Sequence, residues 1–333
     1  MKHAFYLGVD VGGSKTHALI TDEAGRALGF GKAGPGNHEI VGYQGLVDVL
    51  RQATDEALAS AGLGKDQLAG AGFGVAGYDW PSERQATLDA IARLNLKAPV
   101  EAVNDTLIGL LAGSPQGWGV AVVSGTGSNA RGWDVSRQRE GMVTSAGLVM
   151  GEGAGSHEMV SKAVQAVSHE WTRRGPATQL TPALLAYVGA KNLSDFIEGF
   201  MERRYIIPTS AAPLVFQVAA AGDAVALDLV RWAGSELGEL ANCVIRQLDF
   251  QTLAFDVVQV GSMYNGSPLL TDTMRETITA FAPRARLVRL SAPPVVGAVL
   301  LGMECSGFTI TPDVRQTLAH SAVEARMAVP VSV

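Results

Sequence analysis

Two glycine-rich hairpins of the same design, about 110 residues apart, constrain this chain more than any other feature. In the first, the apolar run Phe5–Val11 predicts a buried strand, Gly12-Gly13-Ser14 a tight turn, and the alternating segment Thr16–Ile20 an antiparallel partner. The second repeats this pattern over Gly119–Trp133, with Ser124–Asn129 as its turn. A long-period internal repeat of this kind says more about architecture than any single motif.

A further turn and strand follow each hairpin. Asp22–Gly25 leads into a third strand, Arg26–Lys32, and Asp134–Gln138 leads into Arg139–Thr144. We therefore predict an α/β chain of two homologous lobes. Each lobe is expected to hold a mixed sheet that opens with a three-strand antiparallel meander, and to offer a phosphate-binding hairpin to a shared cleft.

The turns carry the chemistry that phosphate binding requires. Paired glycines allow backbone conformations closed to other residues and bring main-chain N–H groups close to an anion. Asp10 ends the first strand, beside these donors. A carboxylate in that position is where a phosphate-bound Mg²⁺ sits, usually through its waters. The alternatives are an ordinary hairpin in which Asp10 caps a turn and, for the second copy, a turn without a ligand.

Asp105 is the leading catalytic candidate. It follows the short predicted strand Pro99–Val103, at the carboxyl end of the sheet, where α/β lobes expose functional carboxylates. Phosphoryl transfer to an alcohol needs a carboxylate that orients the hydroxyl and takes its proton. The residues alone favour equally a structural role, with Asp105 as the N-cap of the predicted helix Thr106–Ala112.

Taken together, the motifs resemble the superfamily that holds sugar kinases, actin and heat-shock chaperone ATPases. They are Gly8–Thr16, Asn104-Asp105, Ser124–Asn129 and Val260–Ser262. Within the superfamily, the chain is most similar to the branch of N-acetylglucosamine kinases, glucosamine kinases and BadF/BadG-type ATPases. The resemblance implies two actin-like (ribonuclease H-like) lobes with an ATP cleft between them, and the use of ATP and Mg²⁺.

The resemblance also implies roles for individual residues, with Asp105 as the general base. Asp10 would hold Mg²⁺ through water. The residues implied for ATP and its phosphates are Gly12, Gly13, Ser14, Lys15, Gly125, Thr126, Ala219, Gly261 and Ser262. Those implied for the sugar are Asn37, Asp105, Ser128, Asn129, Ser145, Ala146, Gly147 and Glu152.

One stretch departs from the family pattern. Relatives carry Gly-Asp-Glu-Gly-Ser or Ser-Asp-Gln-Gly-Ser after the second hairpin, whereas this chain reads Gly151–Ser156 as GEGAGS. Without a gap, Glu152 replaces the sugar-binding Asp. With a one-residue insertion, Gly155-Ser156 matches the Gly-Ser pair and the acid moves out of register. We prefer the ungapped alignment, because Ala163 and Val164 then also stay in step.

Length and composition agree with two lobes. A chain of 333 residues exceeds one typical domain, and Gly113–Gly117 is the predicted crossing between lobes. We place the first lobe at residues 1–114 and the second at 115–333. The second carries a helical insertion at about 155–248 and a C-terminal tail that could pack back on the first lobe.

The net charge of −6, without a Lys/Arg cluster, argues against nucleic-acid or membrane partners. We expect no signal peptide, because Met1–Tyr6 passes directly into the first predicted strand. No apolar stretch reaches 18 residues, and Cys243 and Cys305 lie far apart in apolar contexts. We expect buried thiols in a reducing cytoplasm. A homodimer is left open.

From these observations we expect an ATP-dependent hexosamine kinase that phosphorylates the 6-hydroxyl of N-acetylglucosamine. Glucosamine or another amino sugar is the alternative substrate. An activator of the BadF/BadG kind, which couples ATP hydrolysis to electron transfer through an iron–sulfur cluster, is the rival from another class. The segment Thr106–Gly155 contains no cysteine that could hold such a cluster near the phosphate loop. A non-catalytic nucleotide or sugar sensor is the third possibility.

Overall fold

The computed structural model describes residues 3–328 of the chain. Its first sheet has the strand order β3-β2-β1-β4-β5. The hairpin strands β1 and β2 and the pair β2 and β3 are antiparallel, whereas β4 runs parallel to both β1 and β5. The strands are β1 (Phe5–Val11), β2 (Thr16–Asp22), β3 (Ala27–Ala33), β4 (Leu68–Val75) and β5 (Val100–Asn104).

The second sheet repeats this order as β8-β7-β6-β9-β10. Its strands are β6 (Gly119–Ser124), β7 (Ser128–Trp133), β8 (Glu140–Met142), β9 (Phe255–Val260) and β10 (Ala285–Arg289). In each sheet the first strand of the glycine-rich hairpin is central, and the two later strands lie on the side away from its partner. The predicted α/β fold class, with the same three-strand opening used twice, is confirmed.

The chain divides into two compact units. The first sheet lies wholly in the first unit, whereas the strands of the second sheet are divided between the two. The first unit holds the residues up to Ala121, Gly132–Gln138 and the residues from Val288 onward, and the second holds Val122–Arg131 and Arg139–Leu287. The predicted boundary after residue 114 differs from this division. The chain also returns to the first unit at Val288, within β10, and its last helices α10 and α11 pack there.

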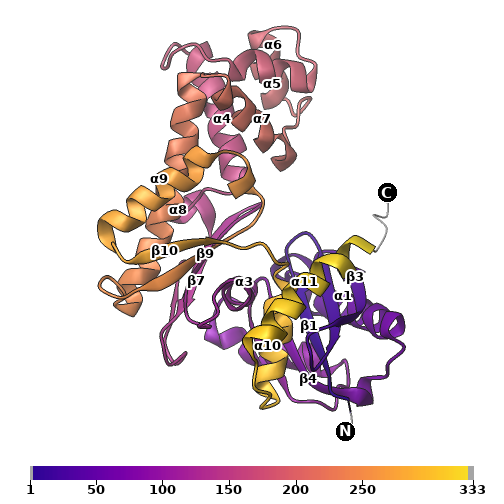
Figure 1. Cartoon of the computed structure of the whole chain (residues 1–333). Coiled ribbons are helices and arrows are strands. Elements are labelled where there is room, and N and C mark those ends of the chain that lie inside the picture. The colour runs from indigo at the N-terminus through magenta and orange to yellow at the C-terminus, as the bar shows by residue number, and fades with distance from the viewer. Residues whose placement is uncertain (1–2, 329–333) are drawn as a thin grey trace. The chain divides into compact units, whose positions relative to one another are not determined.

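Both faces of the first sheet are buried, and successive side chains of β1 point to opposite faces. Leu7, Val9 and Val11 point into one core with α1, and Tyr6 points into another with α10 and α11. Figure 1 shows the C-terminal helices, in yellow, beside the indigo strands of the N-terminus. The helices of this unit are α1 (His38–Ala61), η1 (Lys65–Gln67), η2 (Pro81–Glu83), α2 (Arg84–Ala92), α3 (Asp105–Gly113), α10 (Val295–Cys305) and α11 (Pro312–Ala328).

The second unit carries a helical insertion between β8 and β9. Its helices are η3 (Gly147–Met150), α4 (Ser156–Trp171), α5 (Leu180–Val188), α6 (Leu193–Met201), η4 (Thr209–Ala211), α7 (Ala212–Ala220) and α8 (Ala224–Leu248), followed by η5 (Met263–Asn265) and α9 (Pro268–Phe281). Within the described residues no single helix has the length and apolarity to cross a membrane. The bent pair 209–220 and 224–248 meets that test by length and composition only.

Helix α10 lies unusually close to the first sheet because glycines face it. A Cβ on Gly8 of β1 would overlap the backbone of Val299, and one on Gly72 of β4 would overlap that of Ala298. Gly297 of the same helix leaves room for the backbone of Ile108 in α3. Small residues at these contacts therefore hold β1, β4 and α3 at fixed positions around one helix.

We predict that Gly72→Ala destabilises the protein by about 1–3 kcal/mol, the usual cost of overpacking a core. The added methyl group meets backbone atoms, which cannot rotate away as a side chain would. Gly34→Ala is the matched control, because no atom lies within 4 Å of a Cβ there. Denaturant unfolding of both variants measures the difference, and equal free energies of unfolding would contradict the packing argument.

Candidate active site

The first glycine-rich turn connects β1 to β2 and is held at its base. The Gly12 N–H donates to the carbonyl of Lys15 at 2.9 Å, and the Gly12 carbonyl accepts from Gly36 at 3.1 Å. The Thr16 hydroxyl donates to the carbonyl of Gly34 at 2.9 Å. Gly13, Ser14 and Lys15 at the tip are exposed. The turn thus presents its main-chain groups and one ammonium group to solvent on a fixed base.

Two carboxylates of this unit repel each other. The pKa of Asp10 is raised from its ordinary 3.8 to about 7, first because protein surrounds the carboxylate and then because of the negative charge on Asp105. Lys15 opposes the shift. The pKa of Lys15 is itself lowered, by burial and by the charge of Arg326 on α11. A divalent cation near Asp10 would relieve the repulsion between the two acids.

Asn104, not Asp105, caps helix α3. The Asn104 side chain accepts a hydrogen bond from the Thr106 N–H at 2.9 Å, and Asp105 is the first residue of the helix. The alternative in which Asp105 is the N-cap is therefore wrong. Asn104 is 3% exposed, whereas Asp105 is part-exposed at the start of the helix. The Asp105 carboxylate is thus not used to begin the helix, which is what a catalytic role requires.

Asn37 also begins a helix. Its side-chain oxygen accepts from the Glu39 N–H at 2.9 Å, and its amide group donates to the Glu39 carboxylate at 3.2 Å. The carbonyl oxygen is therefore partly committed to capping α1. The residue remains part-exposed, so its second lone pair is the group left for a ligand.

In the second unit, the turn between β6 and β7 is fastened to the start of α4. The N–H groups of Ser156 and His157 donate to the carbonyls of Gly125 and Thr126, at 2.8 and 3.0 Å. The Ser124 hydroxyl donates to the carbonyl of Ala154 at 2.6 Å. These hydrogen bonds hold the turn against the segment that leads into α4.

The glycines of the two turns mostly have open space around them: a Cβ on Gly13, Gly125 or Gly127 would meet no atom within 4 Å, and one on Gly12 would lie 3.0 Å from the Lys15 carbonyl oxygen. None of Gly12, Gly13, Gly125 and Gly127 has a φ in the left-handed region. The expected use of conformations closed to other residues is therefore wrong at these positions. Close approach instead requires glycine at a neighbouring position, because a Cβ on Gly155 would overlap the backbone of Gly127. Gly261 shows both effects, with a φ of 112° and no room for a Cβ beside the backbone of Ser124.

The second turn forms one end of a cavity of about 690 Å³ that lies within the second unit. Gly125, Thr126, Ser156 and Ser262 make this end polar. Helix α7 makes a largely apolar wall, with Phe216 packed on Gly266. The volume falls in the range of small-molecule and cofactor sites. An apolar wall for a flat ring beside hydroxyl and main-chain donors for phosphates suits a nucleotide.

Sequence reasoning found only part of this cavity. Gly125, Thr126 and Ser262, predicted from the sequence to bind ATP, line it, whereas Ala219 is buried at 4% exposure and its neighbour Ala220 lines the cavity. The lining residues that the sequence did not indicate are Ser156, Thr209, Ser210, Ala212, Pro213, Phe216, Gln217, Met263, Asn265 and Gly266. Those on α7 carry an ordinary amphipathic pattern, which does not distinguish a ligand-facing wall from a core-facing one.

Two residues expected to bind the sugar carry buried polar atoms that lack partners. Within residues 3–328, neither the Asn129 side-chain oxygen nor the Ser145 hydroxyl has a hydrogen-bond partner. Asn129 lies on β7, one residue after Ser128 begins the strand. Ser145 has a φ of 60°, an uncommon conformation for a residue other than glycine. A buried polar group without a partner requires an explanation, and residues with strained backbone are often found at functional sites.

The Glu152 carboxylate holds the loop that joins β8 to α4. One oxygen accepts from the Thr144 N–H and the other from the Thr144 hydroxyl, both at 2.9 Å. Between these two residues lie Ala146 and Gly147, and the Glu152 N–H donates to the Gly147 carbonyl at 2.9 Å. Glu152 therefore shapes this loop, whichever alignment of Gly151–Ser156 applies.

The predicted residues fall into two groups by unit. The first unit holds Asp10, Gly12, Gly13, Ser14, Lys15, Asn37 and Asp105, and the second holds Gly125, Thr126, Ser128, Asn129, Ser145, Ala146, Gly147, Glu152, Ala219, Gly261 and Ser262. The two cysteines lie on α8 and α10, and burial raises the pKa of both thiols. Among the described residues no group of three or more His, Cys, Asp and Glu is placed to hold a metal ion.

Comparison with known proteins places these features in context. The chain is 26% identical to an N-acetylmuramic acid/N-acetylglucosamine kinase of Clostridium acetobutylicum, over 90% of this chain and 99% of that protein. It is 23% identical to an N-acetyl-D-glucosamine kinase of Dictyostelium discoideum, over 91% and 99%. A solved structure of a candidate N-acetylglucosamine kinase from Chromobacterium violaceum shares the fold, with a TM-score of 0.65, 23% identity and 90% and 99% coverage.

The family comparison covers nearly the whole chain. The model of the BadF/BadG/BcrA/BcrD ATPase family matches residues 7–302, which include both glycine-rich turns, the Asn104-Asp105 pair and Gly261-Ser262. This confirms the resemblance stated from those motifs. The chain therefore belongs to the BadF/BadG/BcrA/BcrD ATPase family.

Proposed function

We propose that this protein is an ATP-dependent hexosamine kinase that phosphorylates the 6-hydroxyl of N-acetylglucosamine, with Asp105 as the general base. The observation that carries the proposal is the cavity of about 690 Å³ that ends on Gly125 and Thr126. It offers an apolar wall and a phosphate-binding end within one unit. The names of the two relatives support the choice of an N-acetylated amino sugar.

The proposed step is an in-line transfer between two oxygens. The sugar hydroxyl attacks the γ-phosphorus of ATP, its proton passes to the Asp105 carboxylate, and the bond between the γ-phosphorus and the bridging oxygen breaks to release ADP. Main-chain N–H groups of the two turns and the Lys15 ammonium would hold the phosphates. The transfer requires that the groups of both units act on the same pair of substrates.

The residues present fit a magnesium ion that is held mainly by phosphate oxygens and water. Burial, and after it the negative charge of Asp105, raises the pKa of Asp10, so added positive charge is favourable beside this carboxylate. No protein cage is needed, because Mg²⁺ is usually bound through one or two carboxylates, its waters and the phosphates of a nucleotide. The ion would supply neutralisation of phosphate charge, with Asp10 contacting its water shell.

The arrangement of the sugar-side residues supports N-acetylglucosamine over glucosamine. The partnerless oxygens of Asn129 and Ser145 can accept from the hydroxyl and amide donors of N-acetylglucosamine. An ammonium group would favour a nearby carboxylate, and both Glu152 oxygens already accept hydrogen bonds from Thr144. Glucosamine is therefore the second candidate.

Asp105→Asn should preserve folding and ATP affinity while lowering kcat by about 100- to 10,000-fold, the usual contribution of a general base. Steady-state kinetics and nucleotide titration measure the two properties. Asp89→Asn is a suitable control, because Asp89 is an exposed residue of α2 bonded to Gln85. Turnover of Asp105→Asn within a few-fold of wild type would remove Asp105 from the mechanism.

The sugar preference is tested by comparing kcat/KM for N-acetylglucosamine and glucosamine. We expect the acetylated sugar to be favoured by about 10- to 200-fold, the discrimination that one pocket group supplies. Glu152→Gln should weaken binding of both sugars in similar proportion, since it alters the loop rather than a charge partner. A preference for glucosamine that reverses in Glu152→Gln would show that the carboxylate binds an ammonium group.

Asp10 makes the stability of the metal-free protein depend on pH. Its carboxyl ionises near pH 3.8 in the unfolded chain but near 7 in the folded protein, so stability falls as the pH rises between these values. In EDTA, Asp10→Asn should therefore melt at a higher temperature than wild type at pH 8, and the difference should close towards pH 4. A difference in Tm that does not vary with pH would disprove the raised pKa.

A further inference from the structure

The loop after β4 is tied together by a single carboxylate. Glu83, the last residue of η2, accepts the N–H groups of Asp79 and Trp80 on one oxygen, each at 2.8 Å. The loop enters from β4 through Gly77, whose φ of 82° only glycine adopts readily. The segment 77–83 is thus a defined turn rather than a loose connection.

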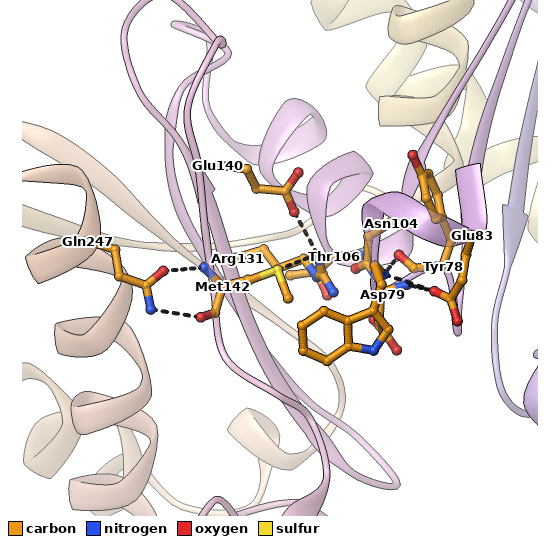
Figure 2. Close-up of polar contacts among 10 residues, drawn as sticks. Tyr78, Asp79, Glu83, Asn104, Thr106, Arg131, Glu140, Met142 and Gln247 are labelled. Carbon is orange, nitrogen blue, oxygen red and sulfur yellow. Dashed lines mark hydrogen bonds and ion pairs between the residues drawn. The ribbon is translucent and has the colours of Figure 1, made fainter. Parts of the chain in front are cut away.

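The turn reaches the strand end that carries the proposed base. The Asn104 amide group donates to an Asp79 carboxylate oxygen at 2.9 Å and to the Tyr78 carbonyl at 3.2 Å. The other end of the same side chain accepts the Thr106 N–H. Figure 2 shows Asn104 between Asp79 and Thr106. The Asn104 side chain therefore links the turn after β4 to the first turn of α3, next to Asp105 in the chain.

We propose that Asp79 is a positioning residue for Asp105, acting through Asn104. This inference rests on the proposed function, in which Asp105 takes a proton from the sugar. Asp79 fixes the rotation of the Asn104 amide, so that its oxygen faces the first turn of α3 and its nitrogen faces the turn after β4. The backbone of Asp105, held between Asn104 and Thr106, then has one orientation.

The energetic reason is that a base must lie within hydrogen-bond reach of the hydroxyl it deprotonates. An Asn side chain that caps a helix without a second anchor can rotate, and the first turn frays when the cap is lost. Displacement of a catalytic group by about 1 Å costs up to about 100-fold in rate. A second anchor on Asn104 guards against that displacement.

The same turn is linked to the start of α1. The His38 side chain is 10% exposed, and its Nε2 lies 3.6 Å from Oε1 of Glu83, the carboxylate oxygen that does not accept from Asp79 and Trp80. The His38 ring stacks on Tyr43 with the ring centroids 4.4 Å apart. Gly77 leaves no room for a Cβ beside the Asn37 side chain. The helix start that carries Asn37 and the strand end that carries Asp105 are therefore anchored on one turn.

The test compares two substitutions of Asp79. Asp79→Ala removes the acceptor and should lower kcat by about 10- to 100-fold, with KM for ATP unchanged. Asp79→Asn retains an oxygen that can accept from Asn104, so its kcat should stay within a few-fold of wild type. Asp89→Asn, in the helix that follows the turn, is the matched control. Amide hydrogen exchange at Thr106 should become faster in Asp79→Ala only.

A swapped pair makes the test independent of how well Asp79→Ala folds. Asn104→Asp keeps a capping oxygen for Thr106 but sets two carboxylates against each other, and should lose turnover. Adding Asp79→Asn restores a donor opposite an acceptor, and should recover most of that loss. Recovery is not expected if Asp79 acts by its charge.

Three results would overturn the proposal. They are unchanged kcat in Asp79→Ala, an Asp79→Asn variant as impaired as Asp79→Ala, and no recovery in the swapped pair. Parallel assay of Asp105→Asn separates this failure from that of the proposed function. If Asp105→Asn is inactive and the Asp79 variants are normal, only the positioning role is wrong. If Asp105→Asn is active, the proposed base is wrong.

Discussion

The close packing of α10 on the first sheet is the constraint on which the rest of the first unit depends. Backbone-to-backbone contact is possible only because Gly8, Gly72 and Gly297 present no side chain there. Packed interiors transmit displacements because they hold few voids. One helix therefore sets the relative positions of the strand that carries Asp10, the strand that leads into the Asp79 turn, and the helix that begins at Asp105.

In the second unit, glycines also allow backbone segments to pack in direct contact. Gly155 and Gly261 let two segments approach the backbone of the turn between β6 and β7, and the start of α4 donates two hydrogen bonds to that turn. A phosphate-binding loop must present N–H groups outward without collapsing onto itself. The hydrogen bonds from α4 use carbonyl groups of the turn, so they leave its N–H groups available for a ligand.

Two asparagines, Asn37 and Asn104, use both ends of the side-chain amide in hydrogen bonds. Asn37 and Asn104 each begin a helix with the side-chain oxygen and use the amide group elsewhere. An Asp can cap a helix equally well but has no donor for the second hydrogen bond. Because Asn104 supplies the cap, the Asp105 side chain is not the N-cap of α3.

The sequence by itself determined the repeated three-strand opening, the two glycine-rich turns, the family, and the candidate acids Asp10 and Asp105. These follow from local periodicity and from motifs that are contiguous in the chain. Only the tertiary structure decided that Asn104 is the cap, that Ala220 rather than Ala219 lines the cavity, and that α10 and α11 belong to the first unit. It also joined Asp79 to Asn104 across 25 positions of sequence. Such pairings depend on how non-local elements pack, because a hydrogen bond or a cavity wall is fixed by distances in space, and residue order does not encode those distances.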